Sequence, residues 1–195
     1  GGATYETAIQ PLKIEHNGNL IAFLGCNSYS GVFAGENSGG AARCSENFSR
    51  IRSQIQELRE QDYQPIVTLQ YREEFPYVYT PTAAQIRDFR LVAEANPVMV
   101  QGSQAHPAQP MEFHKETFIH YGLGNFFFDQ MPWTSTRQEF IDRLTFYNNE
   151  LIGIELRTAI LEEYGRPRPM TVGDPAPEAD RAQFLEMIFA LRPSP

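Results

Sequence analysis

The residues whose side chains could bind a ligand or take part in catalysis lie in two loops, each of which follows a strand-like run. The first loop, QYREEFPYVYTP, begins at Gln70 and carries Arg72, Glu73 and Glu74. A carboxylate in this loop could bind a metal ion, and the guanidinium group of Arg72 could bind an anion. A solvated Arg–Glu cluster that contributes little to stability would have the same composition.

The second loop, GSQAHPAQ, holds Gly102, Gln104 and His106. The glycine permits another backbone segment to come close. Gln104 and His106 are two residues apart, so in an extended segment both side chains would point to the same side. A lone histidine near a strand end is more often structural than a ligand, so these residue types alone do not establish a site.

The elements that must position these loops follow from the spacing of apolar residues. Apolar positions at i, i+4 and i+7 predict a helix over 47–61, and Thr82 with Gln85 has the capping-box spacing of a second helix. Strand-like runs at 65–71 and 97–101 follow the two helices. This alternation is typical of βαβ crossovers and predicts an α/β fold with a parallel core. In such sheets, ligands bind at the carboxyl ends of the strands.

Three turns predict antiparallel hairpins on either side of this region. The first turn is the Asn-Gly pair at 17–18, and the others are expected at 114–115 and 148–149. The second half of the chain is therefore expected to be antiparallel. A Pro-rich segment at 165–177 is expected to cross the surface, and a last amphipathic helix is expected around 184–191.

Composition limits the class of protein. With 195 residues the chain, 1–195, has the length of a single domain. A net charge of −8 argues against non-specific attraction to nucleic acid or to an anionic membrane surface. No apolar run is long enough to span a bilayer. The chain opens without an initiator Met, so we expect the natural N-terminus to lie upstream of Gly1.

The two cysteines, Cys26 and Cys44, are too far apart for a C-x-x-C zinc motif and too few for a disulfide framework. We expect two buried free thiols, with a single bridge in an oxidising compartment as the alternative. Residues 27–46 are rich in Ser, Gly and Asn, which predicts a loop. That loop could lie beside a ligand site or simply at the surface.

Several other polar and aromatic residues are expected to have structural roles. His16 and His114 are expected to be exposed at hairpin tips, and His120 to serve packing or a hydrogen bond within a strand. The aromatic residues 126–128 and Trp133 are expected in a core or an interface before a ligand platform.

Five motifs, taken in order, resemble the capsule-synthesis family called CapA or PgsA, which is associated with poly-γ-glutamate. The family shows A-x-x-P-x-x-I-x-x-N-G-x-x-I-A-F-L-G, then H-W-G-x-E-Y, Pro-x-x-x-Gln, G-H-H-P-H and Y-S-L-G-N-F-x-F-D-Q. The corresponding residues here are 8–25, 70–75, Pro81 with Gln85, 102–106 and 121–130. The last match, YGLGNFFFDQ, is the most specific.

The resemblance implies a calcineurin-type metallophosphoesterase fold, a two-sheet α/β sandwich. Its loops gather His, Asp, Glu and Asn around one or two divalent metals, which polarise a substrate and generate hydroxide. On this resemblance His106, Glu74 and Asn125 are the catalytic candidates. The metal-binding candidates are His106, Gln104 and Gln70.

The chain departs from the family pattern at the site itself. The family's loop histidines are Gln70 and Gln104 here. An amide oxygen suits a hard cation, so a bound divalent metal is expected to be Mg²⁺ or Mn²⁺ before Zn²⁺. The family's glycine beside its aromatic residue is Arg72, which with His106 would bind an anionic group in place of the metal. Pairing of Arg72 with a neighbouring glutamate is the alternative.

The family's early motifs, Gly-Asp, Asn-Leu-Glu and Asn-Asn-His, precede the point where this chain begins. We therefore expect residues 1–195 to be the C-terminal portion of a CapA-like domain, with the upstream half of the same polypeptide as a partner. The predicted function is synthesis or processing of a cell-surface polymer at a degenerate site. The expected ligand is an anionic polymer or a small phosphorylated or carboxylated molecule.

An active divalent-metal-dependent hydrolase, completed by the upstream half, is the alternative function. Whether the protein is an enzyme is thus left open. By analogy with the family, the expected location is extracytoplasmic, in the cell envelope.

Overall fold

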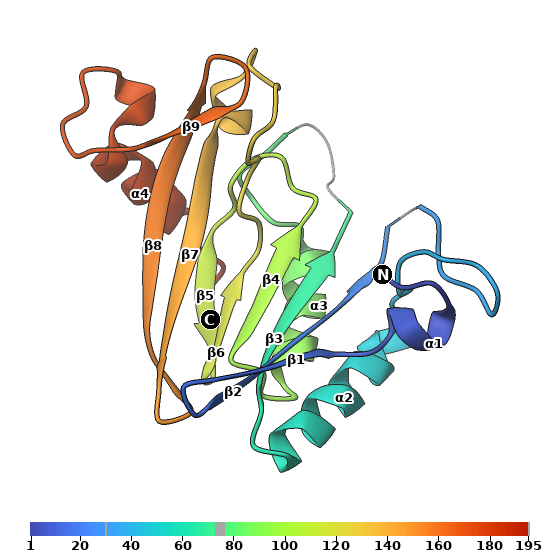
Figure 1. Cartoon of the computed structure of the whole chain (residues 1–195). Coiled ribbons are helices and arrows are strands. Elements are labelled where there is room, and N and C mark those ends of the chain that lie inside the picture. The colour runs from blue at the N-terminus through green and yellow to red at the C-terminus, as the bar shows by residue number, and fades with distance from the viewer. Residues whose placement is uncertain (30, 73–76, 195) are drawn as a thin grey trace.

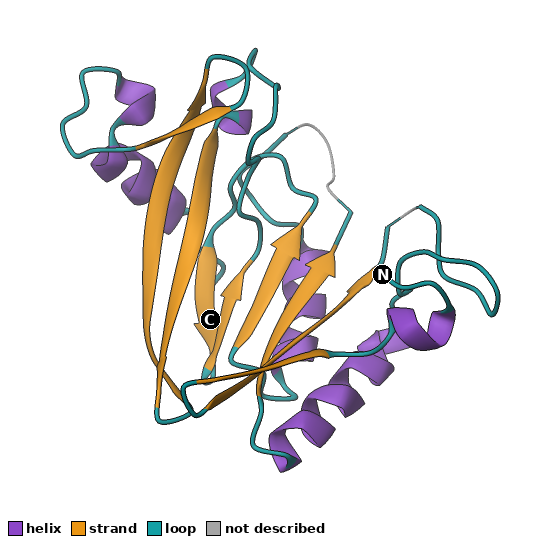
Figure 2. Cartoon of the chain, viewed as in Figure 1, coloured by secondary structure: helices purple, strands orange, loops and turns teal. Residues whose placement is uncertain are grey.

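The computed structural model is an α/β sandwich of two sheets, with helices α2 and α3 on the outer face of the larger sheet (Figures 1 and 2). It describes residues 1–29, 31–72 and 77–194. Within these residues the larger sheet has the strand order β1-β2-β3-β4-β6-β5, and the smaller has the order β7-β8-β9. The strands are β1 Leu12–His16, β2 Asn19–Asn27, β3 Gln64–Gln70, β4 Met99–Ser103, β5 Met111–His114, β6 Thr117–His120, β7 Gln138–Tyr147, β8 Glu150–Glu162 and β9 Arg166–Pro169.

The helices of the described residues are mostly short. The α-helices are α1 Tyr5–Ala8, α2 Ser49–Glu60, α3 Ala83–Ala93 and α4 Arg181–Ala190, and the 3₁₀ helices are η1 Glu46–Phe48, η2 Thr134–Thr136 and η3 Pro177–Ala179. None of them combines the length and the apolar character that a membrane span requires.

The parallel core follows from two helical crossovers. Strands β2, β3, β4 and β6 are parallel neighbours, and helices α2 and α3 lead into β3 and β4. The predicted apolar face of α2, formed by Ile51, Ile55 and Leu58, is buried. It packs in one core with apolar residues of β2 and β3. The predicted α/β class with βαβ crossovers is therefore confirmed.

Helix α3 begins at its predicted cap, although only half of the capping box forms. The Thr82 hydroxyl accepts a hydrogen bond from the Gln85 amide at 3.0 Å. The Gln85 side chain does not return to the cap, because its Nε2 donates to Gln109 Oε1 at 3.0 Å and to the Tyr121 carbonyl at 2.9 Å. The helix start thus ties α3 to the segments on either side of the β5–β6 hairpin.

The hairpin turns were well predicted. The turns at 17–18 and 148–149 both have positive φ at their two central residues, as tight hairpin turns require. The third turn is one residue later than predicted, because His114 pairs with Thr117. The expectation that the whole second half is antiparallel was wrong in one respect, since β6 pairs in parallel with β4 and so extends the first sheet.

The Pro-rich segment contains a strand, which the sequence did not predict. Strand β9 pairs antiparallel with β8, and it lies at the edge of the smaller sheet. A proline cannot donate to a strand ladder and is tolerated at such an edge. The last helix, α4, buries Phe184 and Ile188 as expected. Both contribute to the core between the two sheets.

The cysteines form a disulfide, so the expectation of two free thiols was wrong. Cys26 ends the apolar part of β2, and Cys44 lies 4.9 Å from it between Cα atoms. The intervening loop folds back onto β2, since the Asn27 amide donates to the Ala42 carbonyl at 2.8 Å and the Cys44 amide donates to the Asn27 carbonyl at 3.1 Å. This return of the chain brings together two cysteines that are remote in sequence.

The two sheets are joined at one end by paired asparagines. The Leu20 amide donates to Asn149 Oδ1 at 2.8 Å, and the Asn149 amide donates to Asn19 Oδ1 at 2.9 Å. Gln64 Nε2 also donates to the Asn149 carbonyl, at 2.6 Å. This asparagine latch, formed by Asn19 and Asn149, connects the β1–β2 turn to the β7–β8 turn.

Candidate functional site

Two of the predicted site residues meet at the carboxyl ends of neighbouring parallel strands. Gln70 is the last residue of β3, and Gln104 directly follows β4. Gln70 Nε2 donates a hydrogen bond to Gln104 Oε1 at 2.6 Å. The two glutamine side chains are therefore bonded to each other.

The backbone at Gln104 has an unusual conformation. Its φ is 99°, in the left-handed region that favours glycine. The chain turns at this residue, so the expectation that Gln104 and His106 share one side of an extended segment was wrong. Backbone strain of this kind persists only where the surroundings hold it in place. The bond from Gln70 is one such restraint.

Close to this turn, His106 and Asn125 form a second pair. The imidazole Nδ1 lies 2.8 Å from Asn125 Oδ1, and the Asn125 amide donates to the His106 carbonyl at 3.1 Å. Asn125 Nδ2 donates to the Thr136 carbonyl at 2.9 Å and to Gln130 Oε1 at 3.2 Å. These two acceptors fix the orientation of the Asn125 amide, so its Oδ1 faces the His106 ring. Nδ1 of His106 must therefore carry the proton in this hydrogen bond. The lone pair is then on Nε2, the form in which imidazole binds metals.

Aromatic rings surround His106, and the sequence did not reveal all of them. The rings of Tyr77 and Phe128 lie 5.5 Å from the imidazole between centroids, and Trp133 packs on Tyr77 at 5.3 Å. Phe126, Phe127, Phe128 and Trp133 have between 41% and 70% of their surface exposed, so the expectation that they belong to a core was wrong. An interface role for them stays a prediction.

The first predicted loop is only partly described. Arg72 is exposed, and its role in anion binding stays a prediction. Glu73 and Glu74 lie outside the described residues. The catalytic candidate Glu74 therefore has no structural account.

The described residues do not by themselves fit a divalent metal. Among residues 1–29, 31–72 and 77–194 there is no cluster of three or more His, Cys, Asp or Glu side chains that could hold one. The His106 imidazole is hydrogen-bonded to the Asn125 amide, and the Gln70 and Gln104 amides are hydrogen-bonded to each other. Neutral amide oxygens are weak ligands for transition metals.

The Ser- and Gly-rich loop does lie beside the candidate residues. The amide and the hydroxyl of Ser28 both lie 3.0 Å from the Gln70 carbonyl, to which they donate. A hollow of about 400 Å³ is lined by Asn27, Gln70 and Ser103, together with the disulfide residue Cys26. The disulfide therefore fixes one wall of this hollow.

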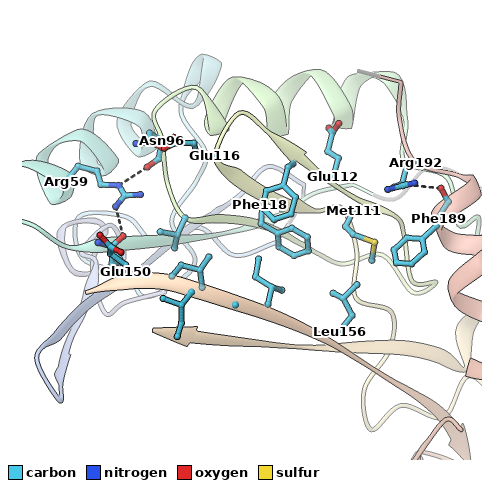
Figure 3. Close-up of a pocket in the computed structure, with 17 residues that line it drawn as sticks. Arg59, Asn96, Met111, Glu112, Glu116, Phe118, Glu150, Leu156, Phe189 and Arg192 are labelled. Atoms are coloured by element: carbon cyan, nitrogen blue, oxygen red, sulfur yellow. Dashed lines mark hydrogen bonds between the residues drawn. The ribbon is translucent and has the colours of Figure 1, made fainter. Parts of the chain in front are cut away.

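Two larger hollows lie between the sheets. One, of about 650 Å³, reaches Ser103 and Gln104 and so adjoins the candidate site. The other, of about 670 Å³, contains none of the predicted site residues. Figure 3 shows this second hollow, with Arg59 at one end, Arg192 at the other and apolar side chains such as Phe118 between them.

The sequence did not predict the buried polar pair that His120 forms with Asp142. His120 Nδ1 lies 2.6 Å from Asp142 Oδ2, and His120 Nε2 lies 3.1 Å from the Gln109 carbonyl. Both side chains are almost inaccessible, at 0% and 3%. The hydrogen-bonding role predicted for His120 is confirmed. Its partner could have been found from the sequence, because Asp142 lies two residues after Phe140 in β7 and therefore points to the same inward face.

The other predicted histidine contacts differ in outcome. His16 is exposed, as expected. His114 is half-buried and not exposed, because its Nε2 lies 2.7 Å from Glu94 Oε1.

Tyr121, which opens the most specific motif, is fully buried. Its hydroxyl donates to Glu112, whose carboxylate is paired with Arg90 at 2.7 Å. Burial raises the pKa of Tyr121, so the phenol stays protonated and serves as a structural donor.

The two sheets and their crossovers are those of a calcineurin-like α/β sandwich, and residues 1–130 match the family described as "Bacterial capsule synthesis protein PGA_cap". The chain belongs to this family. Gln70, Gln104, His106 and Asn125 all lie within the matched residues.

Among curated proteins the chain is similar to the "PGA biosynthesis protein CapA" of Bacillus subtilis (strain 168). The two are 32% identical over 142 residues, which is 70% of this chain and 36% of the relative. The match therefore spans about a third of the relative's length.

Proposed function

We propose that the chain serves in the synthesis or processing of an anionic cell-surface polymer through a degenerate site that binds an anionic group. The observation that carries this proposal is the hydrogen bond between Gln70 and Gln104 at 2.6 Å. Gln104 Oε1 accepts this hydrogen bond and so has one of its two lone pairs already engaged, which makes it a poorer metal ligand. Membership of the capsule-synthesis family supports the polymer class. The name of the Bacillus subtilis relative is consistent with poly-γ-glutamate as that polymer.

The anion is bound by Arg72 in this proposal. An exposed guanidinium offers a planar set of donors that suits carboxylate and phosphate groups. It follows a parallel strand, where ligands bind in such sheets. In this proposal the Gln70 and Gln104 amides supply neutral donors, and the rings around His106 supply an apolar surface.

An extracytoplasmic location in the cell envelope is part of the proposal. The Cys26–Cys44 disulfide supports it, because such bonds persist in oxidising compartments. The disulfide also holds the loop that lines the hollow at Gln70.

A second candidate function is a divalent-metal hydrolase, completed by ligands from polypeptide upstream of residue 1. One observation favours it. Asn125 fixes the His106 tautomer that has its lone pair on Nε2, and a second residue that orients a histidine is usual at metal sites. In that case the anionic substrate would be a phosphoester.

A metal and activity comparison separates the two functions. The full-length polypeptide, including the residues upstream of residue 1, would be compared with its Gln70→His/Gln104→His and His106→Ala variants for bound metal, and phosphodiester hydrolysis would be assayed with Mg²⁺, Mn²⁺ and Zn²⁺. We expect no stoichiometric metal in the parent chain and a gain of Mn²⁺ or Zn²⁺ binding in the double variant. Gln61→His, an exposed site, is the control. Stoichiometric metal and turnover in the parent chain, both lost in His106→Ala, would reject the binding function.

Anion binding is tested separately, with a poly-γ-glutamate oligomer as the probe. We expect Arg72→Ala to weaken binding by roughly tenfold, the value of one lost charged contact. Arg157→Ala, an exposed arginine on the smaller sheet, should leave binding unchanged. Equal affinity of the parent chain and Arg72→Ala would remove Arg72 from the proposal.

A further inference from the structure

Gln85 is a buried polar residue that the proposed function does not use. It is 5% exposed and lies in the first turn of α3, which packs on the larger sheet (Figure 1). Its Nε2 donates to Gln109 Oε1 at 3.0 Å and to the Tyr121 carbonyl at 2.9 Å. Because a side-chain amide nitrogen has two protons, both donors are engaged. Gln85 therefore joins two segments that lie 24 and 36 residues away in the sequence.

These two segments carry the candidate pair formed by His106 and Asn125. They run antiparallel and continue the β5–β6 hairpin beyond its strands, in the same register. The Tyr121 amide donates to the Pro110 carbonyl at 3.1 Å, the Gln109 amide to the Gly122 carbonyl at 2.8 Å, and the Asn125 amide to the His106 carbonyl at 3.1 Å. We call this arrangement, formed by residues 106–110 and 121–125, the site ladder. Gln85 holds the end of the site ladder next to the strands, and the candidate pair lies at its other end.

The geometry of the site ladder depends on what packs against it, because a two-stranded ladder is only marginally stable alone. One restraint comes from β4, since a Cβ on Gly102 would lie 1.8 Å from the Tyr121 carbonyl oxygen. The same carbonyl accepts the hydrogen bond from Gln85. It is thus held by the β4 backbone and by the first turn of α3 together. Removing the Gln85 donors would remove the hold of the helix on the site ladder.

A small movement of the site ladder is enough to change His106. Its Nδ1 lies 2.8 Å from Asn125 Oδ1, and a separation of about 3.6 Å is no longer a hydrogen bond. A shift of about 0.8 Å would therefore break this bond. The imidazole would then lose the contact that selects its Nδ1–H form, and it would populate both of its neutral forms.

We propose that Gln85 is a positioning residue of the candidate site. It acts through the site ladder to hold Asn125 against His106, which keeps the proton on Nδ1 and the lone pair on Nε2. Gln85 itself does not touch the ligand. The inference rests on the proposed function, in which the ligand lies beside His106. The form of the imidazole is measured without a ligand, so the two proposals can fail separately.

The test is nitrogen-15 NMR of the histidine-labelled full-length polypeptide in alkaline buffer, with the imidazole neutral. The parent is compared with Gln85→Met, which keeps the length of the side chain and removes its donors. Gln54→Met is the matched control, because Gln54 is a half-buried glutamine of α2 whose Nε2 donates to the Ile9 carbonyl at 2.8 Å. In Gln85→Met we expect the ratio of the Nδ1–H to the Nε2–H form of His106 to fall roughly tenfold, about the value of one hydrogen bond. Gln54→Met should keep the parent ratio.

Hydrogen exchange gives a second, local measurement. In Gln85→Met the Asn125 amide should exchange at least roughly tenfold faster relative to the amide of Val67, a buried residue of β3. Thr82→Val removes the cap that holds the Gln85 amide at 3.0 Å and leaves the Gln85 side chain in place. It should speed exchange of the Asn125 amide roughly fivefold, the value of one lost cap. This milder variant decides the question if Gln85→Met does not fold.

Three results would overturn the inference. They are a folded Gln85→Met that keeps the parent ratio of the two His106 forms, a Gln54→Met that changes this ratio as much, and a Thr82→Val that leaves exchange of the Asn125 amide unchanged. Binding of a poly-γ-glutamate oligomer by the parent tests the proposed function by itself. A parent that does not bind, together with both imidazole forms in Gln85→Met, would reject the proposed function and retain the positioning role.

Discussion

Glu139 offers a direct way to test how this fold responds to pH. Its side chain is 1% exposed, and neither carboxylate oxygen has a hydrogen-bond partner. Burial alone raises the pKa of this carboxyl from 4.5 to about 8. An acid buried without a donor resists ionisation, because the charged form would lose its hydration.

The sign of the pH effect follows from linkage. The folded pKa lies above the unfolded one, so the folded state binds more protons between about 4.5 and 8. The Glu139 contribution to stability is complete below pH 4.5 and is lost as the pH rises through 8. One pKa unit corresponds to about 1.4 kcal/mol, so at pH 7 the free energy of unfolding is about 3 kcal/mol lower than at pH 4 from this group alone.

The measurement is urea unfolding of the parent chain and Glu139→Gln from pH 5 to pH 8.5. The neutral amide cannot ionise, so the variant should lack this slope and should become the more stable protein at high pH. Glu57→Gln, an exposed glutamate on α2, is the matched control and should follow the parent curve. A constant difference between parent and Glu139→Gln over this pH range would refute the assignment.

Three further perturbations test other parts of the structure. Replacing Cys44 by Ser should lower the free energy of unfolding by about 3 kcal/mol, since the Cys26–Cys44 bridge closes a loop of sequence separation 18; equal melting temperatures of the oxidised and reduced parent chain would contradict this. His120→Ala should cost about 3–5 kcal/mol, because it leaves the buried Asp142 carboxylate without its partner; chemical denaturation measures this loss, and a cost below 1 kcal/mol would count against the pair. Gly102→Ala should prevent folding or cost more than about 3 kcal/mol, since its Cβ would lie 1.8 Å from the Tyr121 carbonyl oxygen; native far-UV and near-UV circular dichroism with unchanged stability would exclude this contact.

Local patterns predicted much of the fold because the residues concerned act through their near neighbours. The Asn-Gly and Asn-Asn turns adopt positive φ wherever they stand, and the spacing of Ile51, Ile55 and Leu58 defines a helix face without reference to the rest of the chain. The parallel core followed from the alternation of helices and strands. Gly102 was predicted to permit a close backbone approach, and the Tyr121 carbonyl lies against it.

The features that the sequence did not predict depend on tertiary contacts. The disulfide needs the loop after β2 to fold back, and nothing in the spacing of Cys26 and Cys44 encodes that return. Strand β9 runs through prolines, which local propensity assigns to a surface crossing. At the candidate site, the motifs singled out Gln70, Gln104, His106 and Asn125, which the structure joins by hydrogen bonds. Their division into two bonded pairs depends on the turn at Gln104, which no local signal marks.

The asparagine latch has a consequence for the hollow of about 650 Å³ between the sheets. Asn19 and Asn149 join the sheets at the β1–β2 and β7–β8 turns, whereas Gln104 lies beyond the carboxyl end of β4. Because the sheets are tied together at the first of these ends, their spacing at the other end, where the hollow reaches Gln104, depends on hydrogen bonds made far from it.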